Sequence, residues 1–382
     1  MQVGIIGAGK LGICFALLIA KSVDKVLITD KNIDYLNTIK DKTFISSEPG
    51  VNELIKTTGN LECITELDDL IKNCDIIYTF VDTPSNEDGT YNITNLESVI
   101  NICLDSEYFT KKCFVVGCTV NPGDTAKIGD KLLSRDIETL YNPEFIAQGS
   151  IIKDLENSDL VLIGGDVSAN TDKLKNIYSS FMISIPVFSL ISHTAAEITK
   201  VAINSYLNTK ITFANMIGSL LIKVELEHEI DDVLNSIGSD SRIGRKYLGF
   251  GLGFGGPCLP RDNIALVRYA EKFNLDLELP LLIDKLNNSH REIIKEFIIS
   301  KNTDNLPYYI EDIGFKKDSD ITTESTRLYL VEDLLSEEKY VYIKSVFDST
   351  HSMLLELESK HKFLRIVKNI DEVKEKIFLI DY

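Results

Sequence analysis

The sequence contains no CxxC pair, and its five histidines are scattered along the chain. Zinc sites are usually built from cysteines and histidines at short, regular spacings, so this pattern argues against a metal centre. The seven cysteines are an odd number, and no secretory signal precedes them. We therefore expect a cytoplasmic protein whose thiols stay free.

Basic residues are also scarce: 40 Lys and Arg stand against 58 Asp and Glu, which gives a net charge of −18. A nucleic-acid-binding surface normally carries a basic stripe, so we expect no nucleic-acid partner.

Long apolar runs are missing as well. The longest, "LGICFALLIA", is too short to span a membrane, which takes about 20 residues. The 382 residues allow two or three globular domains of about 100–200 residues each.

The first thirty residues contain a dinucleotide-binding pattern. A short apolar strand leads into "GAGKLG", an apolar helix follows, and a second strand, "KVLIT", ends at Asp30. In such a unit Gly7 permits the tight turn, Gly9 lets a pyrophosphate approach the backbone, and Gly12 lets helix and strand pack closely. An acid about 20 residues further on binds the ribose hydroxyls, so Asp30 favours NAD over NADP.

Alternation of strands and helices continues to about residue 192. "DIIYTFV" and "CFVVGCTV" are typical of buried parallel strands, and "DLVLIGG" of another. Ligands of open α/β sheets bind at the carboxyl ends of strands, which makes Thr83, Pro84 and Thr119 candidate contacts. For Pro84 plain turn chemistry explains the residue about equally well. The predicted cofactor-binding residues are Gly7, Gly9, Lys10, Leu11, Gly12, Asp30, Thr83 and Thr119.

A segment without glycine or proline runs from Thr194 to Ile217, with apolar residues at helical spacing. It predicts a long, largely buried helix. Lys200, Asn204 and Asn208 are four residues apart and share one face of this helix. They form either a structural polar seam between helices or a catalytic face, and the residues alone leave both interpretations open.

The C-terminal part alternates again, from "LPYYI" through "KYVYI" and "KFLRIV" to "KIFLIDY". We therefore predict an α/β protein of three domains. Residues 1–192 form a Rossmann-type parallel sheet that binds NAD, residues 193–296 a central domain built on the long helix, and residues 297–382 a small Rossmann-like α/β domain.

The loop "GLGFGGPCLPRD" places Cys258 after four glycines and between two prolines. Glycine allows close approaches that other residues forbid, and Pro257 and Pro260 stiffen the chain. A buried structural cysteine needs neither. This composition favours a thiol that must meet a substrate carbon.

Together these motifs resemble the nucleotide-sugar 6-dehydrogenases, a family that includes UDP-glucose and UDP-N-acetylmannosamine dehydrogenases. The resemblance rests on "GAGKLG", "TP" with "EDG", "CTVNPGDT", "NPEF", "AEITKVAIN" and "RIGRKYLGFGLGFGGPCLPRD", over about residues 1–290. It implies oxidation of a sugar primary alcohol to a carboxylate with two NAD. It further implies a sugar-nucleotide substrate, expected to be UDP-linked, a homodimer, and a role in making polysaccharide precursors.

The resemblance also implies residue roles. Cys258 is the nucleophile that captures the aldehyde as a thiohemiacetal and then holds the acid as a thioester. Lys200 and Asn204 contact the substrate and stabilise the oxyanion. Further catalytic residues implied are Asp262 as base or water-orienting group, Glu144 for proton transfer or thioester hydrolysis, and Thr119. Further substrate contacts implied are Phe145, Arg242 (reaching across the dimer), Tyr247, Gly255 and Lys316.

Three features depart from the family pattern: Gln148 replaces a second Glu, Thr323 replaces an Arg, and the C-terminal domain is short. They keep open the possibility of a nucleotide-binding protein without turnover, and a second alternative stands beside it. A β-hydroxyacid-type dehydrogenase also pairs a dinucleotide domain with a helix carrying Lys and Asn, but it transfers one hydride and needs no cysteine. The loop around Cys258 argues against this second alternative.

Overall fold

The computed structural model describes residues 1–317 and 319–380, and it divides into two compact units, Met1–Lys200 and Val201–Tyr382. Residue 318, within the family-like segment "GFKKDSDITTES", lies outside the described residues. So do residues 381 and 382, at the end of the last predicted strand. The boundary between the units falls within one long helix, and the division into three domains stays a prediction.

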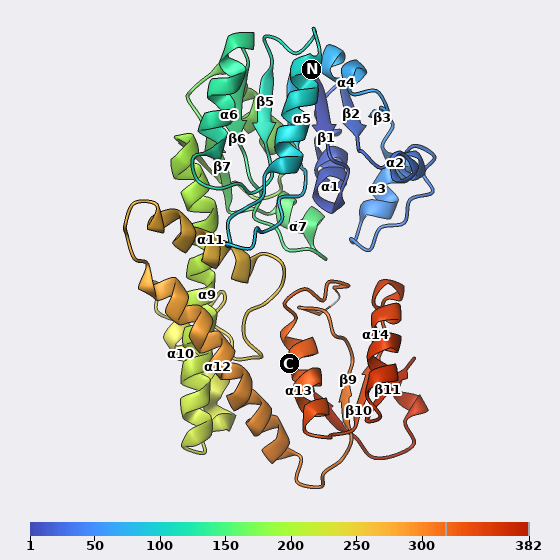
Figure 1. Cartoon of the computed structure of the whole chain (residues 1–382), viewed down its shortest axis with the longest axis vertical. Coiled ribbons are helices and arrows are strands. Elements are labelled where there is room, and N and C mark those ends of the chain that lie inside the picture. Colours follow the sequence, from blue (N-terminus) through green and yellow to red (C-terminus); the bar gives the residue numbers. More distant parts are fainter. Residues whose placement is uncertain (318, 381–382) are drawn as a thin grey trace. The chain divides into compact units, whose positions relative to one another are not determined.

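An eight-stranded sheet forms the centre of the N-terminal unit, in the order β3-β2-β1-β4-β5-β6-β7-β8 (Figure 1). Its strands are β1 (Gln2–Ile6), β2 (Lys25–Thr29), β3 (Leu61–Cys63), β4 (Ile76–Thr79), β5 (Cys113–Val116), β6 (Glu138–Tyr141), β7 (Leu160–Gly164) and β8 (Val187–Ile191). The strand order reverses between β1 and β4, as in dinucleotide-binding folds. The predicted Rossmann-type sheet is confirmed. Its one antiparallel pair is β6 with β7, at Tyr141 and Gly164.

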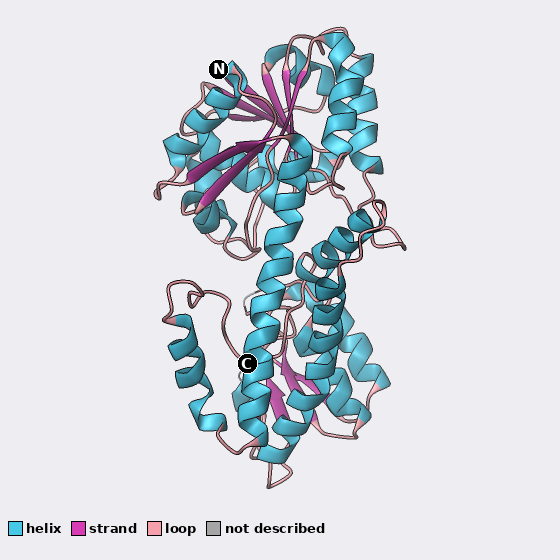
Figure 2. Ribbon diagram, turned by 90° about the vertical axis from the view of Figure 1, so that its left-hand side faces the viewer, coloured by secondary structure: helices cyan, strands magenta, loops and turns pink. Residues whose placement is uncertain are grey.

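Helices cover both faces of this sheet (Figure 2). They are α1 (Lys10–Ile19), α2 (Ile33–Lys40), α3 (Val51–Thr57), α4 (Leu67–Asn73), α5 (Thr94–Asp105), α6 (Asp124–Leu132), α7 (Ile151–Glu156) and α8 (Ala169–Phe181). Successive strand residues point to opposite faces. Ile76 and Tyr78 of β4 enter one apolar core, and Ile77 enters the other. Because both faces are covered, the central strands β4 and β5 are buried along their whole length.

The second unit combines long helices with a small parallel sheet in the order β11-β10-β9-β12. Its helices are α9 (His193–Lys223, which begins in the first unit), α10 (Ile230–Gly238), α11 (Leu259–Glu271), α12 (Glu278–Lys301), α13 (Thr326–Ser336) and α14 (Asp348–Lys360). Its strands are β9 (Tyr308–Ile310), β10 (Val341–Lys344), β11 (Leu364–Val367) and β12 (Phe378–Ile380). The predicted C-terminal α/β unit is therefore present.

Helix α9 is only partly buried, so the prediction of a largely buried helix is wrong for one of its faces. Its polar side chains Lys200, Asn204 and Asn208 are at most 9% exposed. Its apolar side chains Tyr206, Phe213, Met216 and Leu220 are 42–64% exposed. This helix therefore combines a buried polar face with an exposed apolar one. Neither α9 nor any other helix within residues 1–317 and 319–380 is long and apolar enough to cross a lipid bilayer.

Candidate active site

A cavity of about 410 Å³ opens at the carboxyl ends of β1, β2 and β4 in the N-terminal unit. The glycine turn after β1, Asp30 after β2, and Phe80 to Asp82 after β4 form part of its lining. This is where the strand order reverses, the usual ligand position in such sheets. Lys10 and Leu11 begin α1 directly beyond the glycine turn and are half-buried.

The backbone geometry at Gly7, Gly9 and Gly12 is compatible with the roles that their spacing predicts. Gly7 has φ of +99°, and a Cβ there would lie 2.3 Å from the carbonyl oxygen of Phe80. A Cβ on Gly12 would lie 2.0 Å from the carbonyl oxygen of Gly7. A Cβ on Gly9 would meet nothing within 4 Å, so the space above this residue is open. The cradle therefore fits a pyrophosphate at the start of α1.

Asp30 is fixed in the wall of the same cavity. Its Oδ2 accepts a hydrogen bond from the Ala8 amide at 2.8 Å, and its Oδ1 accepts one from the Asn32 amide at 2.9 Å. A carboxylate held in this way fits the ribose hydroxyls of NAD. At the neighbouring strand ends, the Thr83 hydroxyl donates to the Thr119 carbonyl at 2.7 Å. The structure thus brings these two predicted residues together.

Glu144 follows β6 and lies against α8. The Tyr178 hydroxyl donates a hydrogen bond to the Glu144 carboxylate and lies 2.8 Å from Oδ1 of Asn142. Burial raises the pKa of Glu144 to about 7, although the Tyr178 hydrogen bond and the charge of Lys200 both act to lower it. A carboxyl group with this pKa can accept or release a proton near neutral pH, as a general acid–base residue must.

Lys200 joins this cluster from α9. Its Nζ donates to the backbone carbonyl of Glu144 at 2.8 Å and lies 4.6 Å from the centroid of the Phe145 ring. The structure therefore brings together three residues that the sequence predicted separately. It adds Tyr178, which sequence analysis missed because a tyrosine on an ordinary amphipathic helix carries no local signal.

Cys258 is the only one of the seven cysteines that is exposed; five are buried and Cys63 is intermediate. It is the N-cap residue of α11, and Pro260 lies in the first turn. The thiol therefore lies at the positive end of the α11 dipole. Burial raises the pKa of the five buried thiols, so they stay protonated.

Within residues 1–317 and 319–380, no group of three or more His, Cys, Asp or Glu could hold a metal ion.

Polar side chains of α9 hold the first turns of α11. Asn204 Nδ2 donates to Oδ2 of Asp262 at 2.7 Å, and Asn208 Nδ2 donates to the Leu259 carbonyl at 2.8 Å. Asp262 is only 1% exposed and lies one turn beyond Cys258. Asn208 thus contributes to helix packing, whereas Asn204 and Asp262 form a hydrogen-bonded pair near the thiol.

The glycines before Cys258 make room for other parts of the protein. A Cβ would lie 2.5 Å from Oδ1 of Asn287 if added at Gly253, and 2.1 Å from the Glu324 carbonyl oxygen if added at Gly255. A role of the loop in meeting a substrate therefore does not by itself explain these glycines. The loop needs these glycines because neighbouring side chains and backbone press directly against it.

The remaining predicted substrate residues lie in loops of the second unit. Arg242 is exposed and pairs with Asp240 at 2.6 Å. Tyr247 is 51% exposed and has φ of +62°. Lys316 is half-buried and follows Phe315, whose ring occupies the space that a Cβ on Gly256 would need.

Domain models of the UDP-glucose/GDP-mannose dehydrogenase family match most of this chain. The NAD-binding domain of that family matches residues 1–182, and its central domain matches residues 194–289. The chain belongs to the UDP-glucose/GDP-mannose dehydrogenase family. It is an NAD-dependent nucleotide-sugar dehydrogenase, an oxidoreductase acting on a CH–OH group. The family oxidises the sugar in two steps, and neither alternative interpretation is supported.

Individual relatives agree with this assignment. The UDP-glucose 6-dehydrogenase of Pseudomonas aeruginosa is 25% identical over 88% of this chain and 76% of its own length. The GDP-mannose 6-dehydrogenase of Pseudomonas savastanoi pv. phaseolicola is 29% identical over 91% of this chain and 81% of its own length. A UDP-glucose dehydrogenase from the archaeon Pyrobaculum islandicum shares the fold. Its structure has a TM-score of 0.84 at 23% identity, covering 99% of this chain and 89% of that one.

Proposed function

We propose that this enzyme oxidises the 6-hydroxymethyl group of a UDP-linked hexose to a carboxylate, as in the conversion of UDP-glucose to UDP-glucuronate. The observation that carries the proposal is the single exposed thiol, Cys258, at the start of α11 in a chain of this family. Residues 1–192 would bind NAD, residues 193–296 would carry catalysis and dimerisation, and residues 297–382 would hold the nucleotide sugar. The proposed setting is the cytoplasm, in the synthesis of polysaccharide precursors.

The first step removes a proton and a hydride from the primary alcohol. NAD, held by the glycine turn and Asp30, supplies a hydride acceptor when bound. Glu144 has a pKa of about 7 and takes up the alcohol proton. Lys200 and Asn204 donate hydrogen bonds to the developing alkoxide. One preorganised donor of this kind changes a rate by about 10²–10³.

The second step needs Cys258 because an aldehyde has no hydroxyl to ionise. The thiolate forms a C–S bond to the aldehyde carbon, and the carbonyl electron pair moves to oxygen. The resulting thiohemiacetal alkoxide can lose hydride, which leaves a thioester. Water then attacks the thioester carbon and gives its proton to the site's base, the C–S bond breaks, and the thiolate is restored. Asp262, fixed by Asn204, orients this water.

The proposal is tested by mixing the enzyme with excess NAD and a limiting amount of one nucleotide sugar at a time: UDP-glucose, UDP-N-acetylmannosamine or GDP-mannose. We expect two NADH per sugar, measured at 340 nm, with UDP-glucose oxidised fastest. One NADH per sugar would contradict the two-step chemistry. Faster oxidation of another sugar would move the substrate assignment to that nucleotide sugar.

We further propose a homodimer formed through the exposed apolar face of α9. Four large apolar side chains on this face are 42–64% exposed, and apolar patches of this kind mark interfaces. In the dimer, Arg242 of each chain would reach the substrate of the other.

Sedimentation at micromolar concentration should therefore give a species of two chains. Replacing Phe213 by Lys should shift it toward one chain, because a charge would be buried at the interface. Leu355→Lys on α14, where the side chain is 47% exposed, should leave the dimer intact. A fully active monomer would rule out this proposal.

A further inference from the structure

We propose that Asn287 of α12 is a positioning residue that holds the catalytic loop and thereby places Cys258. This inference rests on the proposed function of Cys258 as nucleophile. The loop runs from the end of α10 to the start of α11 without forming a strand. Its backbone groups therefore need partners outside a β-ladder.

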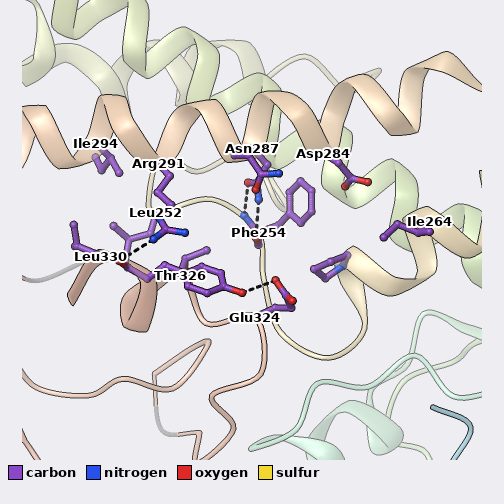
Figure 3. A pocket seen from close by; sticks show the side chains of 13 residues that line it. Leu252, Phe254, Ile264, Asp284, Asn287, Arg291, Ile294, Glu324, Thr326 and Leu330 are labelled. Carbon is purple, nitrogen blue, oxygen red and sulfur yellow. Dashed lines mark hydrogen bonds between the residues drawn. The ribbon is translucent and has the colours of Figure 1, made fainter. Parts of the chain in front are cut away.

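The side chain of Asn287 provides two such partners, and both bind the backbone of the same loop residue, Phe254. Its Oδ1 accepts a hydrogen bond from the Phe254 amide, and its Nδ2 donates one to the Phe254 carbonyl, both at 2.9 Å (Figure 3). The side-chain amide thus pairs with the backbone as a neighbouring strand would. Phe254 lies four residues before Cys258, so its position sets where the chain enters the N-cap of α11.

Two further side chains hold the loop at Gly251, three residues before Phe254. Oδ1 of Asn215 accepts from the Gly251 amide at 3.0 Å, and Nε2 of His290 bonds to the Gly251 carbonyl at 2.7 Å. Asn287 and His290 are three residues apart in α12, a spacing that places both on one face of the helix. Helix α12 therefore binds the loop at Gly251 and at Phe254, which are three residues apart.

Although the glycines of the loop are closely packed, free space remains beside Leu252 and Phe254. A cavity of about 210 Å³ borders it, lined by Leu252 and Phe254 of the loop and by Asn287, Asn288 and Arg291 of α12 (Figure 3). At Gly253, where φ is +99°, an added Cβ would lie 2.5 Å from Oδ1 of Asn287, so the loop and the amide already touch. With the amide removed, the backbone of Phe254 can shift into the cavity.

A displaced loop should harm the chemistry more than the binding. Covalent capture requires sulfur and carbon in a near-attack geometry, where misplacement by about 1 Å costs about 10²-fold in rate. The cavity proposed for the cofactor is lined by residues of the first unit. The expected signature is therefore a low kcat with an unchanged NADH dissociation constant.

The test compares Asn287→Ala with Asn288→Ala, which removes the neighbouring amide from the same helix and cavity. Hydrogen–deuterium exchange of the peptide covering residues 249–258 should speed up about tenfold or more in Asn287→Ala. In the same variant, kcat for nucleotide-sugar oxidation should fall about 10–100-fold while NADH binding, followed by fluorescence, stays unchanged. Asn288→Ala should match the unmodified enzyme in all three measurements.

Gly253→Ala disturbs the same contact from the loop side, because the added Cβ would collide with Oδ1 of Asn287. It should give the same loss of kcat. It also decides the matter if Asn287→Ala does not fold. Unchanged exchange in Asn287→Ala, or faster exchange with kcat within twofold of normal, would overturn the positioning role. Full turnover by Cys258→Ala would instead overturn the proposed function, and the exchange rates would still decide whether Asn287 holds the loop.

Discussion

Replacing Cys258 by alanine will lower the rate of complete oxidation by about 10³-fold or more, because no thiohemiacetal can form without the sulfur. Conversion of alcohol to aldehyde needs only oxyanion donors and NAD, so enzyme-held aldehyde should accumulate. The measurement is NADH produced per limiting nucleotide sugar, with intact-mass analysis of the protein. In the unmodified enzyme the mass should reveal a transient adduct on Cys258, and in the variant none.

Cys63→Ala is the matched control, since Cys63 is the one other cysteine that is not buried. It should keep two NADH per sugar and a normal rate. Cys258→Ser should accumulate a stable ester or hemiacetal, because oxygen forms a less reactive acyl intermediate than sulfur. Unimpaired two-step oxidation by Cys258→Ala would exclude a nucleophilic role for the thiol.

Replacing Glu144 by glutamine will lower kcat by about 10²–10⁴-fold, the usual contribution of a general acid–base residue. The carboxylate is the form that accepts a proton, and burial raises the pKa of Glu144 to about 7. Activity of the unmodified enzyme should therefore rise with pH through about 7 and level off above it. This acidic limb should be absent from the residual activity of Glu144→Gln.

Tyr178→Phe tests the cause of that pH dependence. The Tyr178 hydrogen bond acts to lower the pKa of Glu144, so its removal should move the acidic limb of the pH profile to higher pH.

Gln148→Glu, which restores the acid common in the family, should leave kcat within about tenfold of normal. If Glu144→Gln is as active as the unmodified enzyme, the proton-transfer role belongs to another group.

The sequence predicted the parts of the site that depend on local pattern. Gly7, Gly9, Gly12 and Asp30 follow from one strand–turn–helix unit, whose geometry is fixed within about thirty residues. Cys258 was recognisable from the stiff, glycine-rich loop around it. Each of these signals is short in sequence, so periodicity and spacing are enough to reveal it.

The sequence could not predict side-chain contacts between residues that are distant along the chain. Tyr178 meets Glu144 from 34 residues away, and Asn287 meets Phe254 from 33 residues away. Strands β3 and β8 were also missed. β3 has only three residues, and Ser189 interrupts the apolar run of β8, so neither shows the continuous apolar run of a buried strand. Contacts such as those of Tyr178 with Glu144 and of Asn287 with Phe254 are recognised only in the tertiary structure.

In the proposed homodimer, the exposed apolar face of α9 would tie the stability of this enzyme to its concentration. Apolar side chains that face water in one chain lose their hydration only when another surface covers them. Association then adds to the free energy of unfolding by mass action, so each tenfold dilution removes about 1.4 kcal/mol per dimer. Melting temperatures of this protein should accordingly be compared only at a stated protein concentration.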